Sequence, residues 1–565
     1  MRRSSVLSPQ PAILGVVALL VACGTTARPG PPLAPQVRAA ASARQLAHPA
    51  QPCSGAFVAH PLDHTTTAST RPAHLYESNG AGTALGDLDD DGDQDIVMAN
   101  LAGLNAVLWN EGGLRFRRQD LPHGDSRAAH VVDADGDGLL DIVFTRRNDK
   151  PSFLRNTGRP GPARFAALTL PDVHNPFYTL TWGDLDRDGD LDLVAASYDA
   201  DLLKLQGLIF QQRGGVGVFV YERVGERFVQ HRLASQADAL ALVLPDLDGD
   251  GRRDIWVGND FNRPDYVWLQ GDAAQDWRAT MPADSITENT MSLDLGDVDN
   301  DGVQEILAAD MKPYEKDTAT MARWLPMMKK MTRPLTADDP QHAENALLVR
   351  GAGGRWRNEA YERMLDSSGW SWSAKFGDLD RDGFLDVYVV NGMIAAGLFD
   401  HLPGAELVEP NMAFHNNGRG VFEHRPSWGL GATASGRGMS MADMDGDGDL
   451  DIVVNNLQSP ALLLENRTCG GGSVLVELRQ PSGNTRAIGA TVALHTSAGT
   501  LYRDVRAASG YLSGDPPQVH FGVPPGVTLH GLTVTWPDGA TSFVASVAPQ
   551  SALVVTRRSV LRGDG

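Results

Sequence analysis

Asp87-Leu88-Asp89-Asp90-Asp91-Gly92-Asp93-Gln94-Asp95 is the first copy of a nine-residue pattern that returns six more times along the chain, and this repetition organises the protein. Each copy has acids at positions 1, 3, 5 and 9 and a glycine at position 6. A loop this short holds four carboxylates together only around a cation. Hard oxygen ligands at alternate positions, followed by a glycine that lets the backbone turn, are what Ca²⁺ takes. We therefore expect about seven structural calcium ions.

The predicted metal ligands are the acids at these four positions, with one glutamate among them. They are Asp87, Asp89, Asp91 and Asp95; Asp133, Asp135, Asp137 and Asp141; Asp184, Asp186, Asp188 and Asp192; Asp246, Asp248, Asp250 and Asp254; Asp297, Asp299, Asp301 and Glu305; Asp378, Asp380, Asp382 and Asp386; and Asp443, Asp445, Asp447 and Asp451.

The closest alternative is the EF-hand loop, which requires a bidentate Glu at position 12 and a helix on each side. Position 12 here is always apolar, as at Met98 and Val454. Short β-favouring runs follow the loops instead, for example 95–98 and 451–454. Apolar runs of this length, bounded by turn residues, predict buried strands. The EF-hand interpretation is therefore rejected.

The charge of the chain agrees with a metal-binding role. The 565 residues carry a formal net charge of −21. The 28 acids at ligand positions exceed that number, so the rest of the chain is weakly basic. The acidity therefore belongs to the loops and not to an acidic tail, and nucleic acid is excluded as a partner.

The first residues are typical of an export signal. Arg2 and Arg3 precede an apolar stretch, 12–22, that is too short to span a bilayer. The following residues, Leu20-Val21-Ala22-Cys23, resemble the lipobox of bacterial lipoproteins. That resemblance implies a signal peptide over 1–23, lipidation of Cys23, and attachment to the cell envelope, at the outer membrane or cell surface, by the lipid alone. A plain secretory signal is the alternative.

Beyond Cys23 the chain has two cysteines, one on each side of the repeats. We expect Cys53 and Cys469 to pair in an oxidising compartment; two free thiols are the alternative. Residues 24–55 are rich in Pro, Ala, Gln and Arg without apolar periodicity, which predicts a solvated tether.

The spacing of the copies predicts an all-β fold. Successive loops begin 46, 51, 62, 51, 81 and 65 residues apart. A unit of about 40–50 residues matches one four-stranded blade of a β-propeller, so we expect a seven-bladed ring over 56–468. Alternating patterns broken by turn residues over 473–558 predict a small β-sandwich, followed by a tail, 559–565.

Other candidate residues are weaker. The methionines of 321–331 could bind Cu(I), but methionines at helical spacing more often pack against a surface. Trp370 and Trp372 could present a sugar platform, but filling the core between blades is the more common role. His123, Arg127, His130, His174 and Tyr178 precede the second and third loops and could supply an acid/base pair in a central channel. Ordinary loop-supporting roles are more common for such residues.

The loops resemble FG-GAP/VCBS repeats, as found in integrin α-subunit propellers, and Phe376-Gly377-Asp378 preserves the lead-in. This Phe-Gly lead-in is not preserved before the fourth and seventh loops, which Pro245 and Ala442 precede. The carboxyl-terminal part resembles the ASPIC/UnbV domain through the stretches 487–490, 505–513, 520–523 and 536–539. Together they resemble the cartilage-acidic-protein-like family. Every repeated polar constellation serves metal and no catalytic constellation repeats, which favours a calcium-binding, surface-tethered interaction or adhesion protein that is not an enzyme, with an extracellular protein or glycan as partner. A secreted propeller enzyme acting on polysaccharide or sugar, of lyase or dehydratase type, is the alternative.

Overall fold

The computed structural model describes residues 35–47, 52–207, 210, 214–261, 263–273, 275–331 and 339–558. Strands make up nearly all of its regular structure, so the all-β prediction is confirmed. The helical segments of these ranges are α1 (Asp199–Gln206), α3 (Thr318–Met331) and short 3-10 turns at Gly161–Ala163, Pro403–Ala405 and Pro426–Trp428. Neither α-helix has the length and apolarity needed to cross a bilayer. Cys23, the predicted signal peptide 1–23 and the predicted tail 559–565 lie outside the described residues.

Seven antiparallel four-stranded units follow one another within the described ranges. The first three are β3 (Thr83–Gly86), β4 (Asp95–Met98), β5 (Ala106–Asn110), β6 (Phe116–Asp120); β7 (Ser126–Val132), β8 (Asp141–Arg146), β9 (Ser152–Asn156), β10 (Phe165–Leu168); and β11 (Thr179–Gly183), β12 (Asp192–Ala196), β13 (Val218–Val224), β14 (Arg227–Ala234). The fourth and fifth are β15 (Ala239–Val243), β16 (Ile255–Asn259), β17 (Tyr266–Gln270), β18 (Trp277–Thr280); and β20 (Ser292–Gly296), β21 (Glu305–Ala309), β24 (Ala346–Arg350), β25 (Trp356–Asn358). The sixth is β26 (Gly369–Gly377), β27 (Asp386–Asn391), β30 (Met412–Asn416), β31 (Phe422–His424), with β22 (Met311–Lys312) added beside β26. The seventh is β32 (Gly436–Ala442), β33 (Asp451–Asn456), β34 (Pro460–Glu465) and β2 (Val58–Thr65).

The first strands of these units form a closed circuit. Each contacts the next in the order β3, β7, β11, β15, β20, β26 and β32, and β32 contacts β3 again. The seventh unit takes three strands from the end of the repeats and its outer strand, β2, from their beginning. Beside this junction a disulfide joins Cys53 to Cys469. A circuit completed from both ends leaves no first or last unit with an open face.

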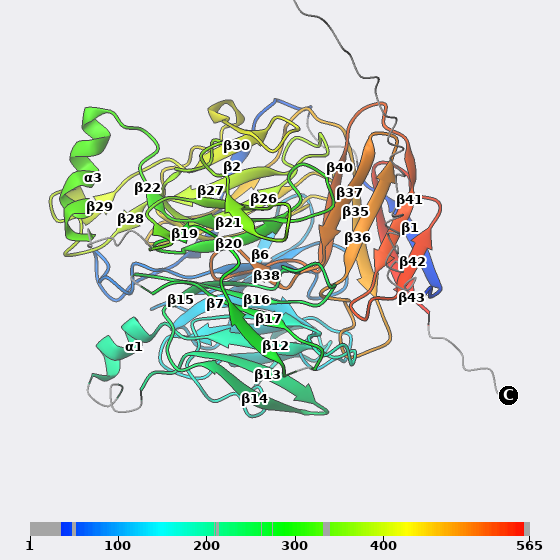
Figure 1. Ribbon diagram of the computed structural model, residues 1–565, viewed down its shortest axis with the longest axis horizontal. Coiled ribbons are helices and arrows are strands. Elements are labelled where there is room, and N and C mark those ends of the chain that lie inside the picture. Colours follow the sequence, from blue (N-terminus) through cyan, green and yellow to red (C-terminus); the bar gives the residue numbers. More distant parts are fainter. Residues whose placement is uncertain are drawn as a thin grey trace, which may run out of the picture.

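Two further four-stranded sheets stand beside the ring, on the side away from α1 and α3 (Figure 1). One contains β1 (Ala39–Gln45), β43 (Ser551–Arg557), β35 (Gly472–Arg479) and β40 (Gln518–Val523); the other contains β37 (Gly499–Asp504), β36 (Thr491–Thr496), β41 (Leu529–Thr535) and β42 (Thr541–Val544). Side chains such as Val476, Leu553 and Val534 share one buried cluster, so the two sheets pack on each other.

Strand β1 corrects the predicted solvated tether, 24–55, over residues 39–45; its residues 24–34 and 48–51 lie outside the described residues. Residues 39–45 pair antiparallel with β43 along the whole strand. Most of their side chains are exposed, so this edge strand is held by backbone hydrogen bonds and shows no apolar periodicity in the sequence.

A segment of the carboxyl-terminal region enters the ring itself. Strands β38 (Ala508–Ser509) and β39 (Ser513–Gly514) contact the first strands β3, β7, β11, β15, β20 and β32, and the Tyr511 N–H donates to Ser373 on β26. Tyr511 has 0% exposure and its hydroxyl donates to the Asn79 carbonyl over 2.9 Å. A Cβ on Gly82 would overlap the Leu512 carbonyl oxygen, so this approach requires glycine. The segment 508–514 therefore fills the centre of the ring. The small pairs β19 (Ile286–Thr287) with β23 (Gln341–His342) and β28 (Met393–Ile394) with β29 (Glu406–Leu407) complete the strands.

Candidate metal centres

Every acidic loop connects the first strand of a unit to its second, and all of them have one backbone shape. The fourth residue is left-handed in each, with φ between 58° and 81°, and the sixth, always glycine, has φ between 83° and 98°. A glycine adopts such angles without strain. The invariant glycine of the pattern therefore has a conformational reason.

The first carboxylate organises the loop. Asp87 accepts the N–H groups of Asp91 (3.1 Å) and Gly92 (2.9 Å), and Asp443 accepts those of Gly446 (2.8 Å) and Gly448 (3.0 Å). The chain is thereby curled around the carboxylates, which brings the acids of the alternate positions together.

The ninth acid closes each loop onto the next strand. In every loop one of its oxygens accepts the N–H of the second residue, over 2.7–3.1 Å. In six loops the other oxygen accepts an N–H from the strand that follows in the sheet, as Asp95 does from Asn110 over 2.9 Å. The ninth acid is thus anchored by the backbone, and its predicted metal contact is additional to these bonds.

The gathered carboxylates have the chemistry of a hard-cation site. Asp87, Asp89 and Asp95 bring ligand oxygens within 4.8 Å of one another, and the corresponding acids of other loops do the same. The pKa of Asp95, Asp141 and Asp192 is raised to about 8, mainly because these carboxyls are buried and also because other carboxylates lie beside them. Within the described chain, oxygens of four of the predicted ligands are buried without a hydrogen-bond donor: Asp89, Asp184, Asp299 and Asp380. A cation among them would supply the missing partner, so these residues fit Ca²⁺.

In four loops a basic side chain lies against a predicted ligand. Arg252 contacts Asp250 in the fourth loop, Arg363 lies 3.4 Å from Asp299 in the fifth, and the second and sixth loops have similar pairs. In the second loop, Arg155 lies 2.5 Å from Asp135 and 2.9 Å from Asp137. In the sixth, His415 Nδ1 lies 3.2 Å from Asp386 and 3.4 Å from Asp380, and the hydrogen bond to Asp386 raises the pKa of the imidazole. These loops have part of their negative charge balanced by the chain itself.

A circuit of side-chain donors joins the loops, and the sequence pattern did not predict it. The second-position carbonyl of each loop accepts a hydrogen bond from a side chain of the adjacent unit. The pairs are Asn156 to Leu88, Arg223 to Ala134, Gln270 to Leu185, Trp356 to Leu247, Asn416 to Val298, Asn466 to Leu379, and Asn110 to Met444. The available signal was an amide residue 15 or 16 positions after the ninth acid, as at Asn110, Asn156, Gln270 and Asn466.

The carboxyl-terminal sheets rest on the loops. The Thr485 hydroxyl donates to Asp133, and the Gly522 N–H donates to Asp378 over 3.1 Å. Arg253, in the fourth loop, lies 2.6 Å from Asp504, and His520 contacts the Gly448 carbonyl over 3.1 Å. The predicted metal centres therefore also form the seat of a second structural unit.

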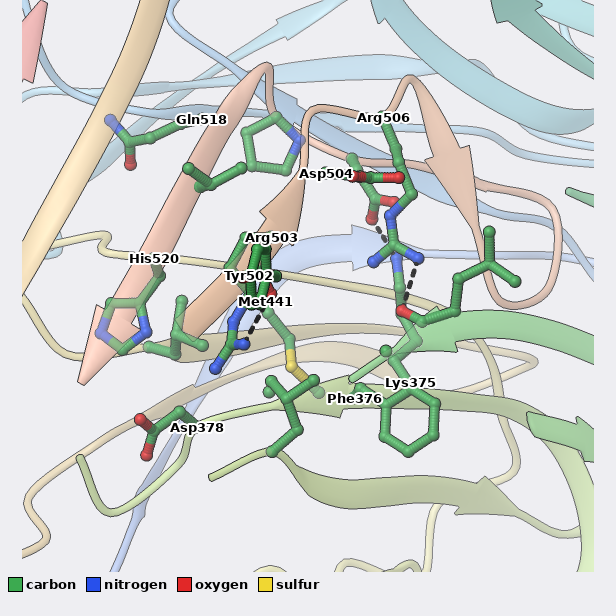
Figure 2. A pocket seen from close by; sticks show the side chains of 18 of the residues that line it. Lys375, Phe376, Asp378, Met441, Tyr502, Arg503, Asp504, Arg506, Gln518 and His520 are labelled. Atoms are coloured by element: carbon green, nitrogen blue, oxygen red, sulfur yellow. Dashed lines mark hydrogen bonds and ion pairs between the residues drawn. The ribbon is translucent and has the colours of Figure 1, made fainter. Parts of the chain in front are cut away.

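Figure 2 shows one charged part of this seat, a cavity of about 110 Å³ between β26 and the carboxyl-terminal sheets. Arg503 and Arg506 reach toward the ring, and Arg506 bonds Asp294 over 2.7 Å. Lys375 of the ring pairs with Asp515. Burial raises the pKa of Asp378 well above its usual value, and the positive charge of Arg503 opposes that rise.

The described residues considered for acid/base catalysis are held by neighbouring groups of the fold. Arg127 is buried, donates to the Gly80 carbonyl over 3.0 Å, and lies 5.6 Å from the Tyr178 ring. His130 is buried on β7 beside the inserted segment. The alternative function placed a catalytic acid/base pair in a central channel. In the described structure, the segment 508–514 fills the centre of the ring.

The aromatic and methionine candidates pack together. Trp370 and Trp372 are 3% and 1% exposed. The ring centroids of Trp324, on α3, and Trp370 lie 5.4 Å apart, with the rings tilted. Met327 of the same helix is buried beside them.

Comparison with protein-family models finds two matches. The model for ASPIC and UnbV matches residues 480–561. The model for the FG-GAP-like repeat matches residues 87–144, 133–195, 246–308 and 407–454. The chain therefore contains FG-GAP-like repeats and an ASPIC/UnbV domain.

Among curated proteins, cartilage acidic protein 1 of Homo sapiens is 25% identical over 189 residues, which is 32% of this chain. The match spans 28% of the length of that relative. Among solved structures, BBS1N in complex with ARL6DN has a TM-score of 0.38 at 10% identity, covering 72% of this chain and 94% of that one. A rhamnogalacturonan lyase of Bacillus licheniformis has a TM-score of 0.33 at 14% identity, covering 73% and 76%. These TM-scores carry no argument about function.

Proposed function

We propose that this chain of FG-GAP-like repeats and an ASPIC/UnbV domain is a calcium-binding, extracytoplasmic interaction protein. In this proposal the seven four-stranded units are the blades of one propeller and the two carboxyl-terminal sheets are a β-sandwich. Each loop would hold Ca²⁺ through its acids at positions 1, 3, 5 and 9. The ions would be structural and would neutralise carboxylates that the fold crowds together.

One observation carries the calcium proposal: buried carboxylate oxygens without donors recur in loops of identical backbone shape. Asp89, Asp299 and Asp380 occupy the same third position of three different loops, and each has such an oxygen. Buried polar atoms are normally partnered. A repeated exception at one position of a repeated loop supports a shared missing partner, and the charge and the oxygen donors select a hard divalent cation.

The ions would also support the second unit. Asp133 and Asp378, which are predicted ligands, accept hydrogen bonds from Thr485 and Gly522 of the carboxyl-terminal region. A loop that loses its ion loses the attraction that holds its carboxylates in place. Calcium removal would therefore loosen the seat as well as the ring, and would expose the surface on which the carboxyl-terminal sheets rest.

Export and anchoring are part of the proposal. A Cys53–Cys469 disulfide suits an oxidising compartment outside the cytoplasm. Lipid on Cys23 would attach the protein to the cell envelope, where the ring would meet an extracellular protein or glycan.

The test is the metal content and stability of the purified mature protein. Elemental analysis after dialysis against trace calcium should give several calcium atoms per chain, and a chelator should lower the melting temperature reversibly. Magnesium at the same concentration should restore less, because it prefers a rigid octahedral shell that retains water. Absence of bound calcium together with an unchanged melting temperature in chelator would overturn the proposal.

A further inference from the structure

A cavity of about 330 Å³ lies beside α3, separate from the acidic loops. Met327 of α3 and Trp372 of β26 line it, and Trp372 packs 5.2 Å from Tyr511. We propose that this cavity binds a hexose-sized sugar that carries a methyl-bearing substituent, as the terminal unit of a glycan. The inference rests on the proposed interaction function, because it names the class of partner.

The walls offer aromatic and thioether surface. Tyr198 lies between Tyr76 and Phe261, with ring centroids 5.9 and 6.2 Å away. The rings provide apolar area against which the C–H faces of a sugar can stack. Met291, Met327 and Met393 add polarizable surface that adapts to a methyl or acetyl group. A cavity of this size has room for one sugar ring and a small substituent.

The polar groups of the lining select a ligand that both donates and accepts hydrogen bonds. The indole nitrogen of Trp370 is a buried donor without an acceptor in the described structure, whereas the side-chain amide of Asn79 faces the Tyr178 hydroxyl. Asp260 accepts from the Tyr198 hydroxyl (2.6 Å) and retains lone pairs for another donor. A purely apolar ligand would leave the Trp370 donor unpaired. A simple anion would meet the Asp260 carboxylate, and the ammonium of Lys330, which also lines the cavity, already donates to the carbonyls of Gly397 and Leu398. Hydroxyl groups satisfy both kinds of partner.

Phe261 gives an independent reason to place a ligand here. It has φ 60° and is 38% exposed, so a bulky side chain is in a left-handed conformation at the edge of the cavity. Its N–H is held by the carboxylate of Asp260 (2.8 Å) and the side chain of Asn289 (3.2 Å). These two bonds hold the left-handed backbone in place and leave the apolar ring exposed at the rim of the cavity. A sugar in the cavity would cover this ring.

The experiment uses the calcium-loaded mature protein in isothermal titrations with N-acetylglucosamine, rhamnose and glucose, together with a glycan array. N-acetylglucosamine or rhamnose should bind more tightly than glucose, which lacks the methyl-bearing group. Phe261→Gly should weaken the Kd about tenfold by removing the stacked ring, while relief of the backbone strain keeps the melting temperature unchanged or raises it. Trp370→Phe should weaken binding by a similar factor through loss of the N–H donor.

Met364→Gly is the matched control. Met364 also has a left-handed backbone, φ 63°, and an exposed apolar side chain, but it does not line the cavity. It should leave sugar binding unchanged. Failure of all three sugars and of the array, or equal effects of the Phe261 and Met364 variants, would overturn the inference. So would an apolar dye that saturates the cavity and that no sugar displaces. Calcium content measured on the same samples separates this failure from failure of the proposed calcium-binding function.

Discussion

Replacing Asn416 by alanine should break one joint of the circuit that connects the acidic loops. Asn416 is 0% exposed on β30. Its side-chain nitrogen donates to the carbonyls of Val298 (2.7 Å) and Leu385 (3.0 Å), in the fifth and sixth loops. Its side-chain oxygen accepts the N–H groups of Gly418 and Gly420, each over 3.0 Å. The side chain of one residue thus makes four hydrogen bonds, of which the bond to Val298 crosses the junction of two units.

The expected cost follows from these bonds. Each contributes about 1 kcal/mol net, and the groups left behind are mostly buried, so Asn416→Ala should lower the free energy of unfolding by about 3–4 kcal/mol. The neighbour Asn417 is exposed, and its side chain accepts one local bond, from Arg419. Asn417→Ala is therefore the matched control, with an expected change within about 0.5 kcal/mol.

Urea unfolding in saturating calcium, followed by tryptophan fluorescence, measures the difference. The Asn416 variant should have a lower midpoint at an unchanged slope. A loss below about 1 kcal/mol, or the same loss in both variants, would refute the circuit as a source of stability. Calcium affinity should fall as well, because Leu385 lies in the sixth loop.

Four other outcomes are expected. In chelator the free energy of unfolding should rise as the pH is lowered from about 8 to about 5, because the pKa of Asp95 is about 8 in the fold and near 4 in the unfolded chain. If saturating calcium left this pH dependence unchanged, metal in the loops would be contradicted. His130 gives the opposite sign, because burial lowers its pKa to about 3. In saturating calcium, the free energy of unfolding of the wild type should fall between about pH 8 and about pH 5 by about 2 kcal/mol more than that of His130→Leu, as measured by urea titration at both pH values. The Cys53→Ser, Cys469→Ser double variant opens a closure of 416 residues and should lose about 3–5 kcal/mol, below the roughly 6 kcal/mol that chain entropy alone gives; equal thermal midpoints with and without the cysteines would argue against the bridge. Gly82→Ala should displace the inserted segment, seen as faster amide hydrogen exchange over 508–514, whereas unchanged exchange would show that the contact is not restrictive.

The loops were predictable because their chemistry is local. Four acids and a glycine within nine residues specify both the turn and the crowding of charge, and no distant contact is required. The seven repeats likewise predicted an all-β chain, since each loop is followed by an apolar run of strand length. Left-handed fourth residues such as Asp90 and Arg187 were not apparent, because their types vary along the chain.

The edge strand β1 and the joints of the circuit could not be read in this way. Residues 39–45 have the composition of a linker, and they form a strand only because the free edge of β43 supplies hydrogen-bond partners. Asn416 is indistinguishable from Asn417 in the sequence. What separates them is which one faces a carbonyl 118 residues away.

The repeated loops, their cation chemistry and the β character of the chain follow from local sequence, because they depend on residues within a few positions of one another. What the loops support depends instead on how distant segments meet in the fold. The fold places the loops beneath the carboxyl-terminal sheets and fills the centre of the ring with residues 508–514. It also leaves a cavity beside α3. Those outcomes depend on contacts between segments hundreds of residues apart, which are fixed when apolar surfaces and unpaired backbone groups are buried together.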